Sequence, residues 1–266
     1  MEKRIGHRAV GKLAAAAAVG LAGFSAGQQA DAALVIDIRA THVNGAPVTV
    51  ADNGDGAETL LITDAPTTVT FQVVARVSGT DGLDNEGFQA IYGVFRSSTG
   101  GLLGDLTTNR EAPFTGTGSQ NGSQVDIDQD GDFDIGFAPN SNATATNPAF
   151  FYARSNIMET GGTRVGTDAE EFVIGTGTWA SKAGGTGNET FLDFIRRRNP
   201  GNPGSNNPSY AGWNEDGSGT SSVRNGNSPY SVDGLTIQAD VVPEPTSLAL
   251  AGLAGIGLLG RRRNKN

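Results

Sequence analysis

The chain has 266 residues, a formal net charge of −9 and no cysteine, which excludes disulfides, thiol catalysis and cysteine-based metal sites. The negative charge is concentrated in the middle of the chain: residues 1–32 carry +2 and residues 246–266 carry +4, so residues 33–245 carry −15. A surface this acidic repels phosphate backbones, and we therefore expect no nucleic-acid partner.

Residues 1–32 have the order of a secretory signal peptide. Basic residues between Lys3 and Lys12 precede an alanine-rich apolar run over 13–24, and Ala30-Asp31-Ala32 has the small-x-small pattern of a cleavage site. We expect export and cleavage after Ala32. Because an exported chain without cysteine has no disulfide framework, a packed core, bound ions or both must stabilise the fold.

Residues 33–242 predict a single all-β domain, either a β-sandwich or a jelly roll. Short apolar runs alternate with clusters of Gly, Asn, Asp, Ser and Pro, and 39 glycines accompany no long helical periodicity. In residues 67–77, every second side chain from Val69 to Val77 is apolar, which predicts a half-buried strand. The clearest predicted strands are 33–39, 59–63, 67–77, 88–96, 150–154, 171–179 and 235–242.

Two short acidic segments, 52–56 and 81–86, contain Asn-Gly or Asp-Gly. These dipeptides predict turns first, and calcium binding is the less favoured alternative at both.

A stronger acidic motif follows at residues 125–134. Its aspartates are Asp126, Asp128, Asp130, Asp132 and Asp134, and Gly131 follows the third. Alternating carboxylates can converge on one hard cation where a glycine allows the chain to turn. The segment resembles the DxDxDG calcium loops of dockerins and other extracellular repeats, although Phe137 stands where a complete EF-hand loop has glutamate. The motif predicts a structural calcium site; a solvated acidic hairpin with Ile127, Phe133 and Ile135 packed inward is the alternative.

Residues 189–198 predict the one short helix of the domain, with Phe191, Phe194 and Ile195 on one side and arginines in the last turn. A long polar loop is predicted at 199–229. Three aromatic residues in or beside it, Tyr210, Trp213 and Tyr230, could form a sugar-binding face. The favoured alternative is that they fold the loop back onto the sandwich.

Catalysis has little support in the sequence. After residue 32, His42 is the only histidine and the nucleophile-elbow pattern G-x-S-x-G does not occur. We expect His42 to be an ordinary side chain near a strand end and the protein not to be an enzyme. Hydrolysis of glycans by two carboxylates stays open, because sequence does not give their separation.

The C-terminal segment 243–266 combines three features in a fixed order. Pro243, Glu244 and Pro245 form a stiff triplet, a short apolar helix is predicted over 248–260, and Arg261, Arg262 and Arg263 follow. About 15 uncharged residues give a helix of roughly 22 Å, short of the roughly 30 Å hydrocarbon core. The arginines favour the cytoplasmic side, so we expect transient or permanent membrane contact.

This tail resembles the PEP-CTERM sorting signal. The resemblance implies recognition by an exosortase and delivery to the cell envelope surface or extracellular matrix, with association with exopolysaccharide and biofilm. We therefore expect a secreted, acidic, structural or adhesive surface protein stabilised by calcium. The alternative is a carbohydrate-binding module or a glycan-active enzyme.

Overall fold

The computed structural model describes residues 34–50, 58–63, 66–136, 150–196, 211–216 and 230–240. All of them belong to one compact unit, 32–266. Every regular element in these ranges is a β-strand. The predicted signal peptide and the predicted C-terminal helix lie outside the described residues.

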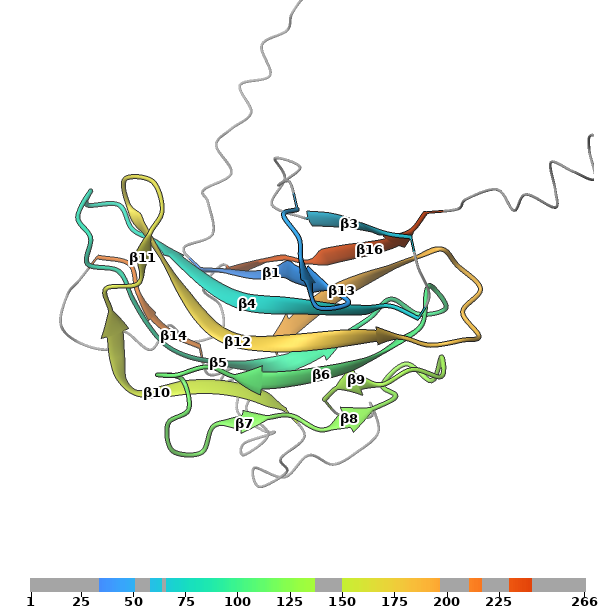
Figure 1. Cartoon of the computed structure of the whole chain (residues 1–266). Coiled ribbons are helices and arrows are strands. Elements are labelled where there is room, and N and C mark those ends of the chain that lie inside the picture. The colour runs from blue at the N-terminus through green and yellow to red at the C-terminus, as the bar shows by residue number, and fades with distance from the viewer. Residues whose placement is uncertain are drawn as a thin grey trace, which may run out of the picture. The chain divides into compact units, whose positions relative to one another are not determined.

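The strands form two sheets (Figure 1). The first has the order β11-β12-β4-β1-β15, with β2 beside β1 and β6 beside β12. Its strands are β1 (Leu34–Val43), β2 (Ala46–Pro47), β4 (Thr68–Ser78), β6 (Gly104–Arg110), β11 (Thr163–Arg164), β12 (Ala169–Ser181) and β15 (Tyr230–Asp233). Neighbours in this sheet are antiparallel except β1 and β15, which run parallel.

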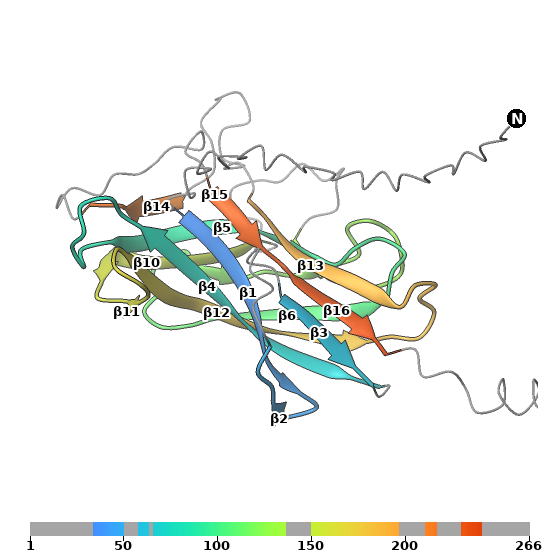
Figure 2. The ribbon, with the colours of Figure 1, turned by 90° about the horizontal axis from the view of Figure 1, so that it is seen from above.

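The second sheet has the order β3-β16-β13-β5-β10-β7, and β14 and β9 also pair with β5. Its strands are β3 (Glu58–Ile62), β5 (Gly87–Arg96), β7 (Gln120–Asn121), β8 (Gln124–Val125), β9 (Asp134–Ile135), β10 (Phe151–Thr160), β13 (Glu189–Arg196), β14 (Ala211–Asn214) and β16 (Leu235–Ala239). At its far edge β3 reaches β1, since the Ala40 amide donates to Glu58 Oε2 at 3.1 Å. Figure 2 shows β3 and β16 lying beside β1.

The core lies between the two sheets, so the predicted sandwich is confirmed. In β4 the predicted inward residues are buried, from Val69 through Phe71 to Val77, as period-2 alternation requires. Aromatic rings join the layers: Phe71 of β4 lies 6.3 Å from Phe95 of β5, measured between ring centroids. Phe95 also packs on Phe151 and Phe194, at 5.1 and 4.9 Å.

The helix predicted at 189–198 is wrong: Glu189–Arg196 form β13, and residues 197 and 198 lie outside the described residues. The side chains of Thr190, Leu192 and Phe194 are buried, while Phe191 between them is exposed, which is the alternation of a strand. The first half of β13 pairs with β16 and the second half with β5. Burial of the period-2 set against two neighbouring strands outweighs the weak apolar stripe at helical spacing.

The stretch predicted as a long polar loop, 199–229, contains β14. Its four residues are all buried and pair with β5 from Ile91 to Gly87. The remainder of that stretch, apart from Glu215 and Asp216, lies outside the described residues.

Candidate metal centre

The acidic segment begins at Asp126, directly after β8, and ends at Asp134, the first residue of β9. Gly131 has a φ of 104°, a left-handed value that glycine tolerates best, as the sequence predicts for this turn. The turn is closed by its own carboxylates: the Gly131 amide donates to Asp126 Oδ2, and the Asp132 amide donates to Asp130 Oδ1, both at 3.2 Å. The local sequence therefore folds the aspartates toward one another.

The five predicted aspartates form two overlapping groups. Ligand atoms of Asp126, Asp128 and Asp130 lie within 4.8 Å of one another. The same holds for Asp128, Asp132 and Asp134. Asp128 belongs to both groups, so its carboxylate is the centre of the cluster. Asp132 and Asp134 are fully buried, whereas the other three are half-buried.

The connection between β5 and β6, residues 97–103, with Gly104 at the start of β6, holds this cluster in place. The Ser97 amide donates to Asp134 Oδ1 at 2.9 Å, and its hydroxyl lies 3.1 Å from Asp132 Oδ2. The Gly104 amide donates to Asp132 Oδ2 at 2.9 Å. Nearer the surface, the Thr99 hydroxyl donates to Asp128 Oδ2 at 2.6 Å and the Gly100 amide donates to Asp130 Oδ2 at 3.0 Å.

Sequence reasoning missed these four supporting residues, because they lie about 30 positions before the aspartates. The pairing of β5 with β9, at Phe95 and Ile135, and the hydrogen bond from the Leu106 amide to the Phe133 carbonyl bring the two segments together. No local pattern in residues 97–104 identifies them as carboxylate donors.

Burial and mutual repulsion perturb the inner carboxylates. Burial raises the pKa of Asp132 to about 6, and the charge of Asp130 adds to the effect. Burial raises the pKa of Asp134 to about 7, helped by the charges of Asp128 and Asp132. Without a bound cation, Asp132 and Asp134 therefore keep their protons to a higher pH than ordinary aspartates do. A bound cation would reverse this preference.

Two carboxylate oxygens of the cluster have unused acceptor capacity. Asp126 Oδ1 and Asp128 Oδ1 are buried and have no hydrogen-bond partner among the described residues. Calcium takes six to eight oxygen ligands, roughly 2.3–2.6 Å away, in flexible geometry. The donor set is all oxygen and strongly anionic, which fits calcium and not the softer transition metals.

The alternative of a solvated hairpin with three apolar residues packed inward is only partly matched. Ile127 and Ile135 are buried, but Phe133 is 42% exposed. Lys182 Nζ lies 5.0 Å from the centroid of the Phe133 ring and 3.3 Å from Asp105 Oδ1. Asp105 Oδ1 also accepts from the Phe133 amide at 2.9 Å.

The proposed sugar-binding aromatics do not form one exposed face. Trp213 is fully buried, and its indole N–H donates to Glu215 Oε1 at 3.2 Å. This corrects the sugar-binding role for Trp213: β14 pairs with β5 and turns the ring into the core, as in the alternative of a loop folded onto the sandwich. Tyr230, at the start of β15, is half-buried, and Tyr210 lies outside the described residues.

His42 lies in β1 and is exposed, with its Nδ1 3.1 Å from the Thr41 hydroxyl. Within the described ranges, no helix has the length and apolar composition needed to cross a bilayer. The sorting residues Pro243 to Pro245 and Arg261 to Arg263 lie outside those ranges.

Comparison with known proteins identifies the tail. Residues 241–263 match the PEP-CTERM protein-sorting motif. The protein is thus exported and held in the membrane by this motif, before exosortase processing directs it to the cell surface. A comparison of the whole sequence with curated proteins gives no match.

Among solved structures, the chain is similar to the seventh ScaB type I cohesin from Pseudobacteroides cellulosolvens. The identity is 6%, the TM-score is 0.37, and the match covers 78% of this chain and 92% of the cohesin. It is also similar to a chain of the complex between a CaDoc0917 variant and CaCohA2, at 9% identity, with a TM-score of 0.31 and coverage of 78% and 99%. Both TM-scores are below 0.5, so the function of this chain is argued from its own residues.

Proposed function

We propose that this exported chain is a non-catalytic structural or adhesive protein of the cell surface or extracellular matrix, stabilised by calcium in the loop Asp126–Asp134. The observation that carries the calcium site is the convergence of two carboxylate groups on Asp128. Two of the carboxylate oxygens in that cluster are buried without a hydrogen-bond partner in the described part of the chain. The sorting motif supplies the destination.

A structural role for calcium follows from the position of the loop. It connects β8 to β9 and is hydrogen-bonded to the segment that joins β5 to β6. A cation bound there would fasten two connections at one end of the sandwich. The one histidine after residue 32, His42, is exposed on β1 and contacts a threonine hydroxyl, which supports a non-catalytic role.

Calorimetric titration of the purified chain with calcium tests this site. Asp128→Asn should weaken binding at the loop more than Asp126→Asn, because Asp128 belongs to both carboxylate groups. We expect a loss of affinity of at least about tenfold, since carboxylate number sets calcium affinity. Asp84→Asn is the matched control, because Asp84 is an acidic residue paired with Arg164 on a different loop. Equal affinities in Asp128→Asn and in the control would disprove the loop site.

The surface role is tested in the native host. Replacement of Pro243, Glu244 and Pro245 by alanine should leave the chain in the membrane fraction, because the exosortase handle is removed. Replacement of Ser205, Asn206 and Asn207 by alanine is the control and should leave surface delivery unchanged.

The same host tests the partner. We propose association with exopolysaccharide, so the mature chain should co-sediment with the purified matrix polymer. Release of soluble sugars from that polymer by the purified chain would favour the glycan-active alternative instead.

A further inference from the structure

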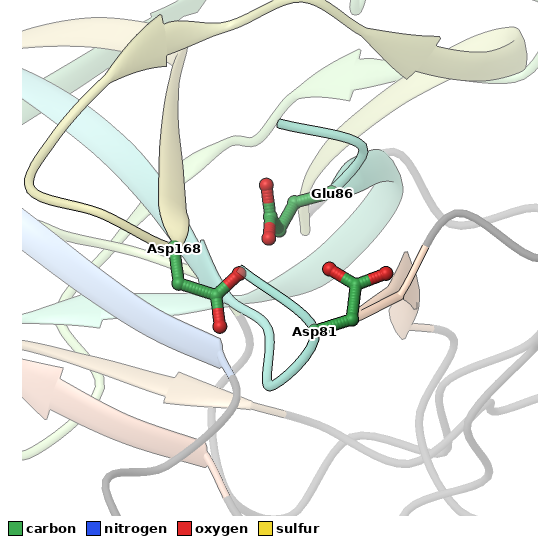
Figure 3. Close-up of side chains that lie close together, drawn as sticks. All are labelled: Asp81, Glu86 and Asp168. Atoms are coloured by element: carbon green, nitrogen blue, oxygen red, sulfur yellow. The ribbon is translucent and has the colours of Figure 1, made fainter. Parts of the chain in front are cut away.

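A second group of acidic side chains lies away from the loop Asp126–Asp134. Asp81 and Glu86 belong to the connection between β4 and β5, and Asp168 lies in the turn between β11 and β12. One carboxylate oxygen from each lies within 4.8 Å of the other two. Figure 3 shows the three carboxylates facing a common space. Asp168 lies more than 80 positions after Asp81 and Glu86, so the fold assembles the group.

Glu86 is the unusual member. Its side chain is 0% exposed, and its Oε1 has no hydrogen-bond partner among the residues that the structure describes. Its other oxygen accepts from the Asn85 amide, at 3.2 Å. Burial raises the pKa of Glu86, and the adjacent Asp168 carboxyl raises it further. A buried carboxylate with an unfilled acceptor requires either a proton or a cation.

The space beside Gly79 shows where the oxygens converge. A Cβ placed on Gly79 would collide with Glu86 Oε1 and the Glu215 carbonyl oxygen, and would lie 3.0 Å from Asp168 Oδ1. Three oxygens from three separate segments therefore surround one small space. All three oxygens are hydrogen-bond acceptors. They can come this close together beside Gly79 because that residue has no side chain.

The segments that supply these oxygens are already fixed by hydrogen bonds. The Gly79 amide donates to the Asp168 carbonyl at 3.0 Å, and the Gly82 amide donates to Asp168 Oδ1 at 3.2 Å. The Thr80 amide donates to Asp216 Oδ1 at 2.8 Å, which ties the same loop to the end of β14. Little backbone ordering is then needed for an ion to bind.

We propose that Asp81, Glu86 and Asp168, with the Glu215 carbonyl oxygen, form a second site for a divalent cation of the calcium class. The ion joins the β4–β5 connection, the β11–β12 turn and the end of β14. Hard carboxylate and carbonyl oxygens with flexible separations are the ligands that calcium prefers. The site neutralises the buried Glu86 and links segments from both sheets.

The test is calcium stoichiometry by equilibrium dialysis at pH 7.5, in wild type and in a set of single variants. Wild type should bind two ions, and Glu86→Gln and Asp168→Asn should each bind one. Asp84→Asn, in the same loop but paired with Arg164, should keep both. Asp128→Asn should lose the other ion only. A chain that binds one ion, retained in Asp128→Asn and lost in Asp168→Asn, would disprove the loop site and support this one.

A second measurement does not depend on the stability of the variants. Calcium added to the wild-type chain should slow amide hydrogen exchange at residues 79–86 and 166–168. Gly79→Ala should abolish that slowing, because its methyl group fills the space between the oxygens. Unchanged exchange at these residues, or two ions bound by folded Asp168→Asn, would mean that Glu86 shares a proton with Asp168 and that the proposal is wrong.

Discussion

Strand β5 has an acidic cluster at each end, and the two clusters differ in how the chain builds them. After the strand, Ser97 donates to Asp132 and Asp134, which belong to a set of five aspartates within nine consecutive residues. Before it, Glu86 meets Asp168 from a distant turn and the carbonyl of Glu215 from a third segment. The residues of the first cluster belong to one local sequence motif. The second cluster forms only when three segments that are distant in the sequence pack together.

The clusters also differ in what stabilises their charges. In the loop Asp126–Asp134, backbone amides and the Ser97 and Thr99 hydroxyls donate to the carboxylates, so hydrogen bonds alone hold much of the loop. At Glu86, Oε1 has no hydrogen-bond partner among the described residues, and the oxygens that share the space beside Gly79 with it are acceptors. A bound ion would therefore add to an already ordered loop at one end of β5, whereas at the other end a cation or a proton must neutralise Glu86.

The largest expected effect comes from core substitutions in β5, which should lower stability independently of either acidic cluster. Phe88 and Phe95 lie near opposite ends of β5, and each packs on other aromatic rings in the core. Phe88→Ala and Phe95→Ala should each lower the free energy of unfolding by about 3–5 kcal/mol, from lost burial and a new cavity. Urea denaturation with calcium and with chelator measures this. The loss should be the same in both conditions, and a loss seen only with calcium would contradict that independence.

Calcium itself should give the next largest effect. At free calcium 100 times its dissociation constant, each site should add about 2.7 kcal/mol to the free energy of unfolding. The two ends of a ten-residue strand are about 33 Å apart, so the two increments should add. Thermal denaturation of wild type, Asp128→Asn and Asp168→Asn against calcium concentration measures them. If both variants showed the full wild-type stabilisation, neither cluster would be a calcium site.

The pH dependence of the free energy of unfolding without calcium tests the buried carboxylates of the loop Asp126–Asp134. In the folded chain the pKa values of Asp132 and Asp134 are raised to about 6 and about 7, above the value of about 3.9 in an unfolded chain. The folded state thus binds protons more tightly, and this stabilisation is complete below about pH 4 and lost as pH rises through 6 and 7. We expect a loss on the order of 4 kcal/mol between pH 5 and 8 in chelator, since each pH unit over which one of these carboxyls keeps its proton contributes about 1.4 kcal/mol.

Calcium should oppose that loss, because it binds the deprotonated carboxylates. Chemical denaturation at a series of pH values, with and without calcium, checks the sign. A free energy of unfolding that rises between pH 5 and 8 in chelator would contradict the burial argument for Asp132 and Asp134.

The smallest effect is expected from Asp84→Asn. This residue lies between Asp81 and Glu86 but pairs with Arg164 at 2.6 Å, and both side chains are largely exposed. An exposed ion pair contributes about 0–1 kcal/mol, so the variant should be nearly as stable as wild type. Its calcium response, measured by thermal denaturation, should be unchanged. A large loss of calcium stabilisation would extend the second site to Asp84.

Much of the architecture could be predicted from local patterns. Alternation over residues 67–77 identified the inward face of β4, and the spacing of aspartates identified the loop at 126–134. The same local reasoning failed at residues 189–196. There Phe191, Phe194 and Ile195 fit a helical stripe, while Thr190, Leu192 and Phe194 fit a strand, and only the neighbouring strands decide between them.

The sequence by itself determined where the protein goes and which residues its local acidic loop contains, because a sorting tail and a nine-residue turn act through consecutive residues. Tertiary structure decided the burial of Trp213 and the meeting of Glu86 with Asp168. Both depend on strand pairing between distant segments: β14 joins β5, and β12 joins β4. Burial and charge proximity are properties of packed neighbours, and those neighbours are chosen only when the two sheets close over their shared core.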